Sequence, residues 1–412
     1  MVGVVSVKPE KNNTYCDYPF KQLALKNWKK DNLLEYTPCC MMSNSGNDMM
    51  SISDSHLLSP IQAFDSQQFV QLRRDLSSNV KNESCQTCWN QENKGIDSAR
   101  LFSSEYDKES FTNLRQLDIT LSNKCNLMCR MCNYGNSHTF KKEIAFFKQN
   151  DLLSQIQEAT SNHYPSKTFM PNSSKSIQLN WLRNNTKKIK VLKASGGEPF
   201  YDEQIIDLLK IYIKNNDAKN TILEFDTNGT LFTDELIDML KCFKLLNHSI
   251  SVDGVETVYE HIRYPHSFMN FKSSLKKYLS LDNIHCVHYA FVLSSINIFN
   301  INDFLFFIAS ITKNKDFYVN FEKVRPYDRG ISINLLPIDI LKDAKEEIMM
   351  SDFYKYYGLE KCRNLINSID DGILNNEVNK EKFLSEIKLF DLARNQNFKN
   401  YLDKRIISWI HE

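Results

Sequence analysis

Between residues 113 and 325 the hydrophobic positions switch between two periods, which predicts a repeated strand-and-helix fold. Six segments carry the short alternating or continuous apolar runs typical of buried strands. They cover residues 114–121, 189–195, 221–227, 248–254, 285–293 and 316–324. Intervening segments, such as those around 143–157 and at 203–214, 234–244 and 301–312, have apolar residues at helical spacing. We therefore predict an α/β fold with a partial parallel (β/α)6 barrel over residues 111–330.

The two ends of the chain have different patterns. Residues 1–110 hold five cysteines among polar stretches and too few apolar residues for a core of their own. We expect a small N-terminal module that depends on its cysteines. Residues 331–412 predict a C-terminal helical extension, with helices at 338–350, 381–395 and 398–410. Residues 161–188, rich in Asn, Ser and Lys, predict an insertion or mobile loop.

The composition narrows the class of protein. The 412 residues are 42% hydrophobic and 25% charged, with a net charge of +1. These values exclude a disordered tail protein, a collagen and a coiled coil, and they show no strong nucleic-acid or membrane footprint. The chain has no basic leader and no run of about 18 apolar residues. We expect a cytoplasmic protein whose cysteines are metal ligands or core residues rather than disulfides.

A cysteine-rich loop follows the first predicted barrel strand. The stretch CNLMCRMC places Cys125, Cys129 and Cys132 in CxxxCxxC spacing. Three thiolates without a nearby fourth suit a 4Fe-4S cluster with one open iron, whereas a structural zinc site has four ligands. The loop would lie at the mouth of the barrel, where active sites form. A zinc site or free thiols are the alternative.

The next three predicted strands end in short glycine turns. These turns are SGGEP (Ser195–Pro199), TNG (Thr227–Gly229) and SVDG (Ser251–Gly254). Glycine lets the backbone approach a ligand closely, and Glu198 with exposed carbonyl groups can accept hydrogen bonds from an ammonium group. Four of the eleven glycines therefore mark one rim of the predicted barrel.

The cysteine spacing and these turns resemble the radical S-adenosylmethionine (SAM) enzymes, over residues 113 to about 325. The resemblance implies a 4Fe-4S cluster that passes one electron to the sulfonium of SAM, so that the carbon–sulfur bond breaks to methionine and a 5′-deoxyadenosyl radical. The radical abstracts hydrogen from a substrate. An electron donor such as flavodoxin or ferredoxin is implied as a partner. We expect a peptide or protein substrate; the alternatives are modification of a nucleotide, sugar or RNA, and a non-catalytic zinc-stabilised binding protein.

The same resemblance implies a set of cofactor-binding residues. The set is Met131, Gly196, Gly197, Glu198, Pro199, Asn228, Ser251, Asp253 and Arg263. The GGEP turn would contact the amino group of the methionine part, Met131 would lie against the adenine through its backbone, and Ser251 would hydrogen-bond the cofactor. Arg263 would pair with the methionine carboxylate or form an ordinary surface ion pair. Asn228 could instead be a turn residue, and Asp253 could cap the following helix.

The N-terminal cysteines form a second pattern. It runs through CDYPF (Cys16–Phe20), TPCC (Thr37–Cys40) and ESCQTCW (Glu83–Trp89) to an ExxxxxSxR stretch (Glu92–Arg100). This pattern resembles the twitch module, a shortened relative of the SPASM domain that binds an auxiliary 4Fe-4S cluster, although SPASM modules usually follow the barrel. The resemblance implies Cys16, Cys39, Cys85 and Cys88 as ligands, with Cys40 as the alternative to Cys39. Four thiolates also make an acceptable zinc site, so iron–sulfur and zinc both stay open.

Overall fold

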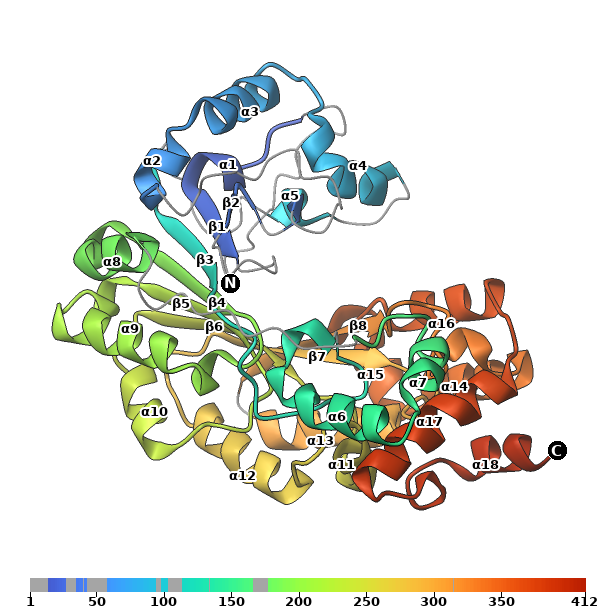
Figure 1. Cartoon of the computed structure of the whole chain (residues 1–412). Coiled ribbons are helices and arrows are strands. Elements are labelled where there is room, and N and C mark those ends of the chain that lie inside the picture. The colour runs from blue at the N-terminus through green and yellow to red at the C-terminus, as the bar shows by residue number, and fades with distance from the viewer. Residues whose placement is uncertain are drawn as a thin grey trace. The chain divides into compact units, whose positions relative to one another are not determined.

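The computed structural model (Figure 1) describes residues 14–26, 35–39, 41–42, 58–93, 98–102, 113–132, 134–165, 177–313 and 315–412. Contacts within the chain divide it into two compact units. The first comprises Met1–Ser122, Pro171–Ser195 and Gln204–Glu224; the second comprises Asn123–Met170, Gly196–Glu203 and Phe225–Glu412. The division into domains at residues 110 and 330 stays a prediction.

The first unit joins the N-terminal cysteine segments to the first strands of the sheet. Its elements are α1 (Tyr18–Lys21), β1 (Gln22–Lys26), β2 (Glu35–Thr37), α2 (Pro60–Phe64), α3 (Gln67–Ser77), α4 (Gln86–Asn93), α5 (Ala99–Phe102), β3 (Gln116–Thr120), α8 (Ile177–Asn184) and β4 (Val191–Ser195), with nearly all of α9 (Glu203–Lys214). Strand β3 pairs in parallel with β1 on one side and β4 on the other, and β2 is antiparallel to β1. Strands β1 and β2 were not predicted.

A buried ion pair ties three strands of this unit together. The Nζ of Lys26 in β1 donates to Oδ1 of Asp118 in β3 at 2.5 Å, and to the hydroxyls of Thr120 and Ser195 at 3.1 Å each. The Lys26 and Asp118 side chains are 4% and 2% exposed. Because removing one partner of a buried pair leaves an uncompensated charge, this contact holds β1 firmly against β3.

The second unit contains the remaining strands and most of the helices. Its elements are α6 (Lys141–Gln149), α7 (Leu153–Ala159), α10 (Asp234–Leu240), β6 (Leu245–Ser251), α11 (Glu256–Ile262), α12 (Phe268–Leu279), β7 (Cys286–Leu293), α13 (Ile301–Thr312), β8 (Asp316–Lys323), α14 (Ile338–Met350), α15 (Asp352–Lys361), β9 (Cys362–Arg363), α16 (Leu365–Leu374), α17 (Lys380–Arg394) and α18 (Lys404–His411). Strands β6 to β9 are parallel neighbours in chain order. In β7 alternate residues are buried, and Phe291 packs on Phe304 of α13 with ring centroids 4.7 Å apart.

All six predicted strands are present, as β3, β4, β5 (Ile222–Thr227), β6, β7 and β8, and the predicted α/β class with a parallel sheet is confirmed. Strand β5 runs from the first unit into the second. Among the described residues β2 and β9 each pair on one side, so the sheet is open, as in a partial barrel.

The structure differs from three local expectations, one of which, the insertion or mobile loop at 161–188, it describes only in part. The predicted helix around residues 143–157 is broken into α6 and α7, because Asp151 adopts a left-handed backbone conformation with φ of 57°. The predicted loop 161–188 contains helix α8, while residues 166–176 lie outside the described part. The predicted helix 398–410 starts as a short 3-10 turn, and α18 begins at Lys404.

The C-terminal extension packs on the segment that follows the cysteine loop. Helix α17 runs beside α6 and α7 (Figure 1). Phe390 of α17 belongs to one buried cluster with Met128, Tyr134, Phe147 and Tyr164. Residues far apart in the chain therefore share the core next to the loop. In the described part of the chain, no helix has the length and apolar character needed to cross a membrane.

Candidate functional site

The cysteine loop (residues 125–132) is held by main-chain hydrogen bonds to the end of α11 and to the segment that follows it. The N–H of Met128 donates to the carbonyl of Tyr264 at 2.8 Å, and the N–H of Arg130 donates to that of Ile262 at 2.9 Å. Backbone pairing of this kind holds the loop in place. The three predicted ligands thus lie on one ordered segment.

Burial makes the three thiols of this loop weaker acids than an ordinary cysteine. It raises the pKa of Cys125 to about 12, raises that of Cys129, and raises that of Cys132 well above its ordinary value. Nearby donors favour the thiolate: the N–H of Leu127 points at Sγ of Cys125 at 3.4 Å, and Nη1 of Arg263 lies 3.9 Å from Sγ of Cys129. Metal loading must therefore displace protons from these sulfurs.

Within the described residues, no three or more His, Cys, Asp or Glu side chains form a group that could hold one metal ion. A 4Fe-4S cluster does not require such a group, because each cysteine binds a different iron.

The GGEP turn lies directly against the cysteine loop. A Cβ at Gly197 would be 2.2 Å from the carbonyl oxygen of Lys124, a distance that no side chain tolerates. The N–H of Glu198 donates to the same oxygen at 2.7 Å. Gly196 has a φ of 140°, which favours glycine. The two motifs that the sequence analysis singled out are thus joined through their main chains.

The carboxylate of Glu198 is engaged inside the protein. It accepts hydrogen bonds from the hydroxyl of Thr227 at 2.8 Å, the N–H of Asn228 at 2.7 Å and the N–H of Phe200 at 3.3 Å. Burial raises the pKa of Glu198 to about 7, even though these hydrogen bonds favour its charged form. Glu198 therefore connects the turn after β4 to the turn after β5.

Asn228 makes a further contact with the cysteine loop. Its Nδ2 donates to Oδ1 of Asn126 at 2.9 Å and lies 3.8 Å from Sγ of Cys125. Its Oδ1 accepts from the N–H of Thr230 at 3.0 Å, as expected of a turn residue. Asn228 thus shapes its own turn, which was one of the two expected roles, and it also contacts a predicted ligand. Its binding of SAM stays a prediction.

Arg263 and Asp253 form a buried ion pair beside Cys129. Their side chains are 6% and 2% exposed, and Nη2 of Arg263 lies 2.7 Å from Oδ2 of Asp253. Burial alone lowers the pKa of Arg263, but Asp253 raises it above the ordinary value. The other oxygen of Asp253 accepts from the N–H of Val292 at 2.8 Å. Asp253 does not cap α11, whose N-cap is Val255, and Arg263 is not a surface cation.

The remaining predicted cofactor residues have simpler positions. Met131 is buried within the cysteine loop, and Ser251 is the partly buried last residue of β6. Pro199 begins a short 3-10 turn after the GGEP glycines. Their roles toward SAM stay predictions.

A group of buried arginines lies next to the cysteine loop and was not predicted from the sequence. Each is paired with a carboxylate at 2.5 Å, in the pairs Arg130–Asp391, Arg329–Glu386 and Arg394–Glu143. Arg329 also donates to the carbonyl of Arg130, inside the loop, at 2.8 Å. The sequence does contain an indication of these pairs. Helix α17 carries Glu386, Asp391 and Arg394 on its buried face, where apolar residues are the norm.

Several nitrogens of these guanidinium groups have no hydrogen-bond acceptor among the described residues. They are Arg130 Nη1, Arg263 Nε, Arg329 Nε and Nη1, and Arg394 Nη1 and Nη2. Buried donors without acceptors are costly, and a concentration of them is unusual. A negatively charged cluster on the three thiolates would give these cations an electrostatic counterpart. The residues present therefore fit an iron–sulfur cluster.

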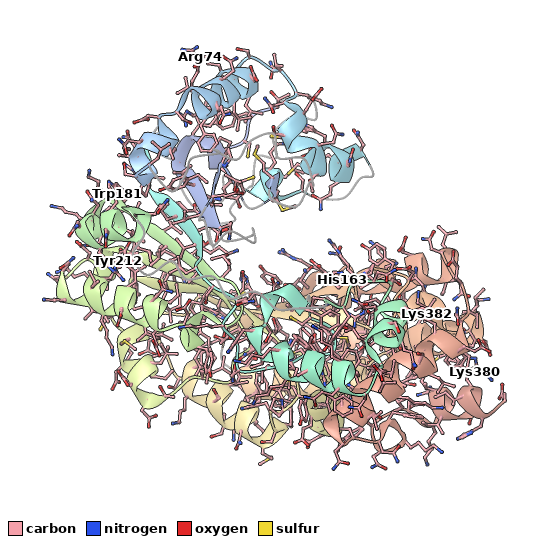
Figure 2. The ribbon with its side chains drawn as sticks, in the orientation of Figure 1. Arg74, His163, Trp181, Tyr212, Lys380 and Lys382 are labelled. Atoms are coloured by element: carbon pink, nitrogen blue, oxygen red, sulfur yellow. The ribbon has the colours of Figure 1, made fainter. Side chains whose placement is uncertain are left out.

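The N-terminal cysteines also come together, within the first unit. Cys16, Cys39, Cys85 and Cys88 line one pocket, and Figure 2 shows sulfur atoms gathered beside α4 and α5. Burial raises the pKa of Cys85 to about 12 and also raises that of Cys88. Cys40 lies outside the described residues.

The ExxxxxSxR stretch closes this pocket from one side. Both Nε and Nη2 of Arg100 donate to the Glu92 carboxylate, at 2.9 and 2.7 Å, and Nη1 donates to the carbonyl of Tyr15 at 2.8 Å. Ser98 donates to the same carboxylate at 2.5 Å. The guanidinium also lies over the ring of Trp89, 4.9 Å from its centroid. The residues of this motif thus fix the chain around the cysteines.

Part of the chain matches the model of a known protein family. Residues 119–308 match the family model of the Radical SAM superfamily. The match supports an enzyme with SAM-dependent radical chemistry, and it implies a 4Fe-4S cluster and SAM. It identifies neither the substrate nor the reaction.

Among solved structures, the chain is similar to Streptococcus suis SuiB bound to S-adenosylmethionine, with 15% identity and a TM-score of 0.35 over 69% of this chain and 57% of that one. SuiB bound to precursor peptide SuiA is 14% identical, with a TM-score of 0.38 over 72% of this chain and 60% of that one. TYW1 with a lysine-pyruvate adduct bound is 15% identical, with a TM-score of 0.28 over 55% of this chain and 69% of that one. The chain thus spans somewhat over half the length of the SuiB chains. No curated protein sequence matches significantly.

Proposed function

We propose that this protein is a radical SAM enzyme that holds a 4Fe-4S cluster on Cys125, Cys129 and Cys132 and removes a hydrogen atom from its substrate. The observation that carries the proposal is the direct main-chain contact between the GGEP turn at Gly197 and the start of the cysteine loop at Lys124. When bound, the cluster and SAM supply the radical chemistry.

The residues of the chain bind and orient the two groups. The three thiolates hold three irons and leave the fourth open to SAM. The GGEP turn presents its carbonyl groups to the ammonium of SAM, because the side chain of Glu198 is occupied by Thr227 and Asn228. Asn228 and Arg263 donate toward the sulfurs of Cys125 and Cys129 and so keep negative charge on them.

The test is anaerobic reconstitution followed by addition of dithionite and SAM. We expect 5′-deoxyadenosine from the wild type and none from Cys129→Ala, which should also lose about four irons per chain. Cys242→Ala is the matched control, because Cys242 is exposed and far along the chain from both cysteine sets. If 5′-deoxyadenosine persists in Cys129→Ala, or is absent from the loaded wild type, the proposal is wrong.

We further propose that the N-terminal pocket binds an auxiliary 4Fe-4S cluster, as in a twitch module. Cys16, Cys39, Cys85 and Cys88 surround a pocket without forming, among the described residues, a group that could hold one ion. Four cysteines that line one pocket suit a 4Fe-4S cluster, and a zinc site with four thiolates is the alternative that the next experiment distinguishes.

The auxiliary site has its own experiment. The double variant Cys85→Ala, Cys88→Ala should lower the iron content from roughly eight to about four per chain, while the absorbance of the cluster on Cys125, Cys129 and Cys132 is kept. Zinc in the wild type that disappears from the double variant would show a zinc site instead.

For the substrate we propose a peptide or protein, with an electron donor such as flavodoxin or ferredoxin and a reducing, cytoplasmic location. The support is the resemblance of the N-terminal cysteine pattern to the twitch module, together with the near-neutral net charge, which does not favour RNA. Candidate peptides labelled with deuterium should transfer the label into 5′-deoxyadenosine. Transfer from a labelled nucleotide or sugar instead would reject the peptide assignment.

A further inference from the structure

We propose that the buried ion pairs around the cysteine loop set the reduction potential of the cluster bound there, and that the pair Arg394–Glu143 is one of its determinants. The inference rests on the proposed function, since it requires a cluster on this loop. It assigns a role to the C-terminal extension, which supplies Arg394 from α17.

The geometry places the cation of this pair toward the loop. The guanidinium of Arg394 lies over the ring of Tyr264, 5.2 Å from its centroid, and the carbonyl of Tyr264 accepts the N–H of Met128 in the loop. Its Nη1 and Nη2 have no acceptor among the described residues. The side of Arg394 that carries these two nitrogens is therefore not neutralised by a hydrogen bond.

The carboxylate of the pair is more fully satisfied than the cation. Oε1 of Glu143 accepts from Nε of Arg394 at 2.5 Å, and Oε2 accepts from the hydroxyl of Tyr164 at 3.3 Å. Each pair is formally neutral, but its positive end keeps unused donors. The result is a positive potential at the guanidinium end of this pair, although the pair has no net charge.

Arg329 repeats the arrangement. All three of its acceptors, the carbonyl of Arg130, the hydroxyl of Tyr134 and the carboxylate of Glu386, lie on Nη2. Its Nε and Nη1 have no acceptor within the described chain. Two arginines that are distant in sequence from the loop thus keep donors without acceptors among the described residues, and both are buried next to groups that contact the loop.

The physical consequence follows from charge. A 4Fe-4S cluster with three thiolate ligands is already negative, and reduction adds one more negative charge in a buried site. Nearby cations lower the free energy of that reduced state, and they act strongly because buried charges are poorly screened. Groups outside the ligand set tune metal sites in this way.

The experiment changes the charge of one pair while conserving its shape. The variants are Arg394→Gln, Glu143→Gln and the double variant, in the full-length chain with Cys85→Ala and Cys88→Ala so that one cluster is titrated. At a fixed potential, the ratio of reduced to oxidised cluster, read by electron paramagnetic resonance, should fall about tenfold in Arg394→Gln and rise about tenfold in Glu143→Gln. Each change is a midpoint shift of about 59 mV for a one-electron couple. The double variant should stay close to the parent.

Two controls separate charge from structure. Arg394→Lys keeps the charge and should keep the midpoint, whereas Arg325→Gln, at a side chain that is 70% exposed, should change nothing. Shifts of the same sign in both single variants, or an equal shift in Arg394→Lys and Arg394→Gln, would overturn the inference.

If one single variant does not load iron, the sign of the shift in the other decides. The corresponding variants of the second pair, Arg329→Gln and Glu386→Gln, give an independent measurement of the midpoint shift. A parent chain without iron on the loop refutes the proposed function itself. If the parent protein holds iron on the loop but its reduction potential does not change in these variants, this inference alone is refuted.

Discussion

Replacing Gly197 by alanine tests whether the GGEP turn and the cysteine loop form one unit. The added Cβ would lie 2.2 Å from the carbonyl oxygen of Lys124, 2.7 Å from its carbonyl carbon and 2.8 Å from that of Asn123. All three atoms are main chain, so no side-chain rotation relieves the overlap. The turn must separate from the loop and lose the hydrogen bond from the N–H of Glu198 to Lys124.

The cost can be worked out from these contacts. Overpacking in a tight core costs about 1–3 kcal/mol, and the lost buried hydrogen bond adds about 1 kcal/mol. We expect Gly197→Ala to lower the free energy of unfolding by about 2–4 kcal/mol and to weaken SAM binding and iron loading of the cysteine loop.

The assays are urea unfolding, iron per chain and a SAM titration. Gly372→Ala in α16 is the matched control, because its Cβ would meet a flexible side-chain methyl of Ile333 at 2.9 Å. If Gly197→Ala unfolds, loads iron and binds SAM like Gly372→Ala, the two motifs are not coupled as the structure indicates.

Three further changes test other parts of the molecule. The pKa of Glu198 is about 7 in the folded protein, against an ordinary value of 4.5. The wild type should therefore lose about 3 kcal/mol of folding stability as the pH rises from 4.5 to 7, because the buried carboxyl group must ionise. Glu198→Gln has no such group, so its melting temperature should rise relative to that of the wild type over this pH range, and a constant difference would contradict the raised pKa of Glu198. Asp391→Asn leaves Arg130 buried without its carboxylate and should cost about 3–5 kcal/mol in urea unfolding at pH 7. Hydrogen bonding from His261 and the charge of Arg130 hold the pKa of Asp391 below its usual value despite burial, so its stabilisation is lost as pH falls and the two unfolding midpoints should converge in acid; equal midpoints at pH 7 would refute this. Arg100→Gln breaks the paired hydrogen bonds to Glu92 and should lower iron in the N-terminal pocket alone, which iron analysis of the Cys129→Ala background can check.

The barrel strands were predictable because their signal is local. Each of β3 to β8 has its own apolar run, and the run alone indicates a buried strand. Strand β1 has a comparable five-residue run, Gln22–Lys26, but its partner β3 lies far along the chain. No local pattern announces a pairing of that kind, and the polar, cysteine-rich surroundings of β1 suggested a separate module.

The candidate site was predictable to the same extent. Its cysteines and glycine turns are contiguous motifs, and the structure brings the turn at Gly197 onto the loop as expected. The buried arginines follow from tertiary packing: Arg130 meets Asp391 across 261 positions of the chain. Charged residues on the buried face of α17 indicate that a partner must exist, but they do not identify it.

Strand β1 has a consequence for shortened forms of this protein. A chain that began at residue 111 would keep every strand of the predicted barrel, yet it would expose the edge of β3, which β1 covers along Gln116–Thr120. It would also leave the Asp118 carboxylate without Lys26. Exposed strand edges pair with one another and aggregate. The cysteine-rich segment thus also covers a strand edge of the sheet, and a chain shortened to begin at residue 111 is expected to aggregate.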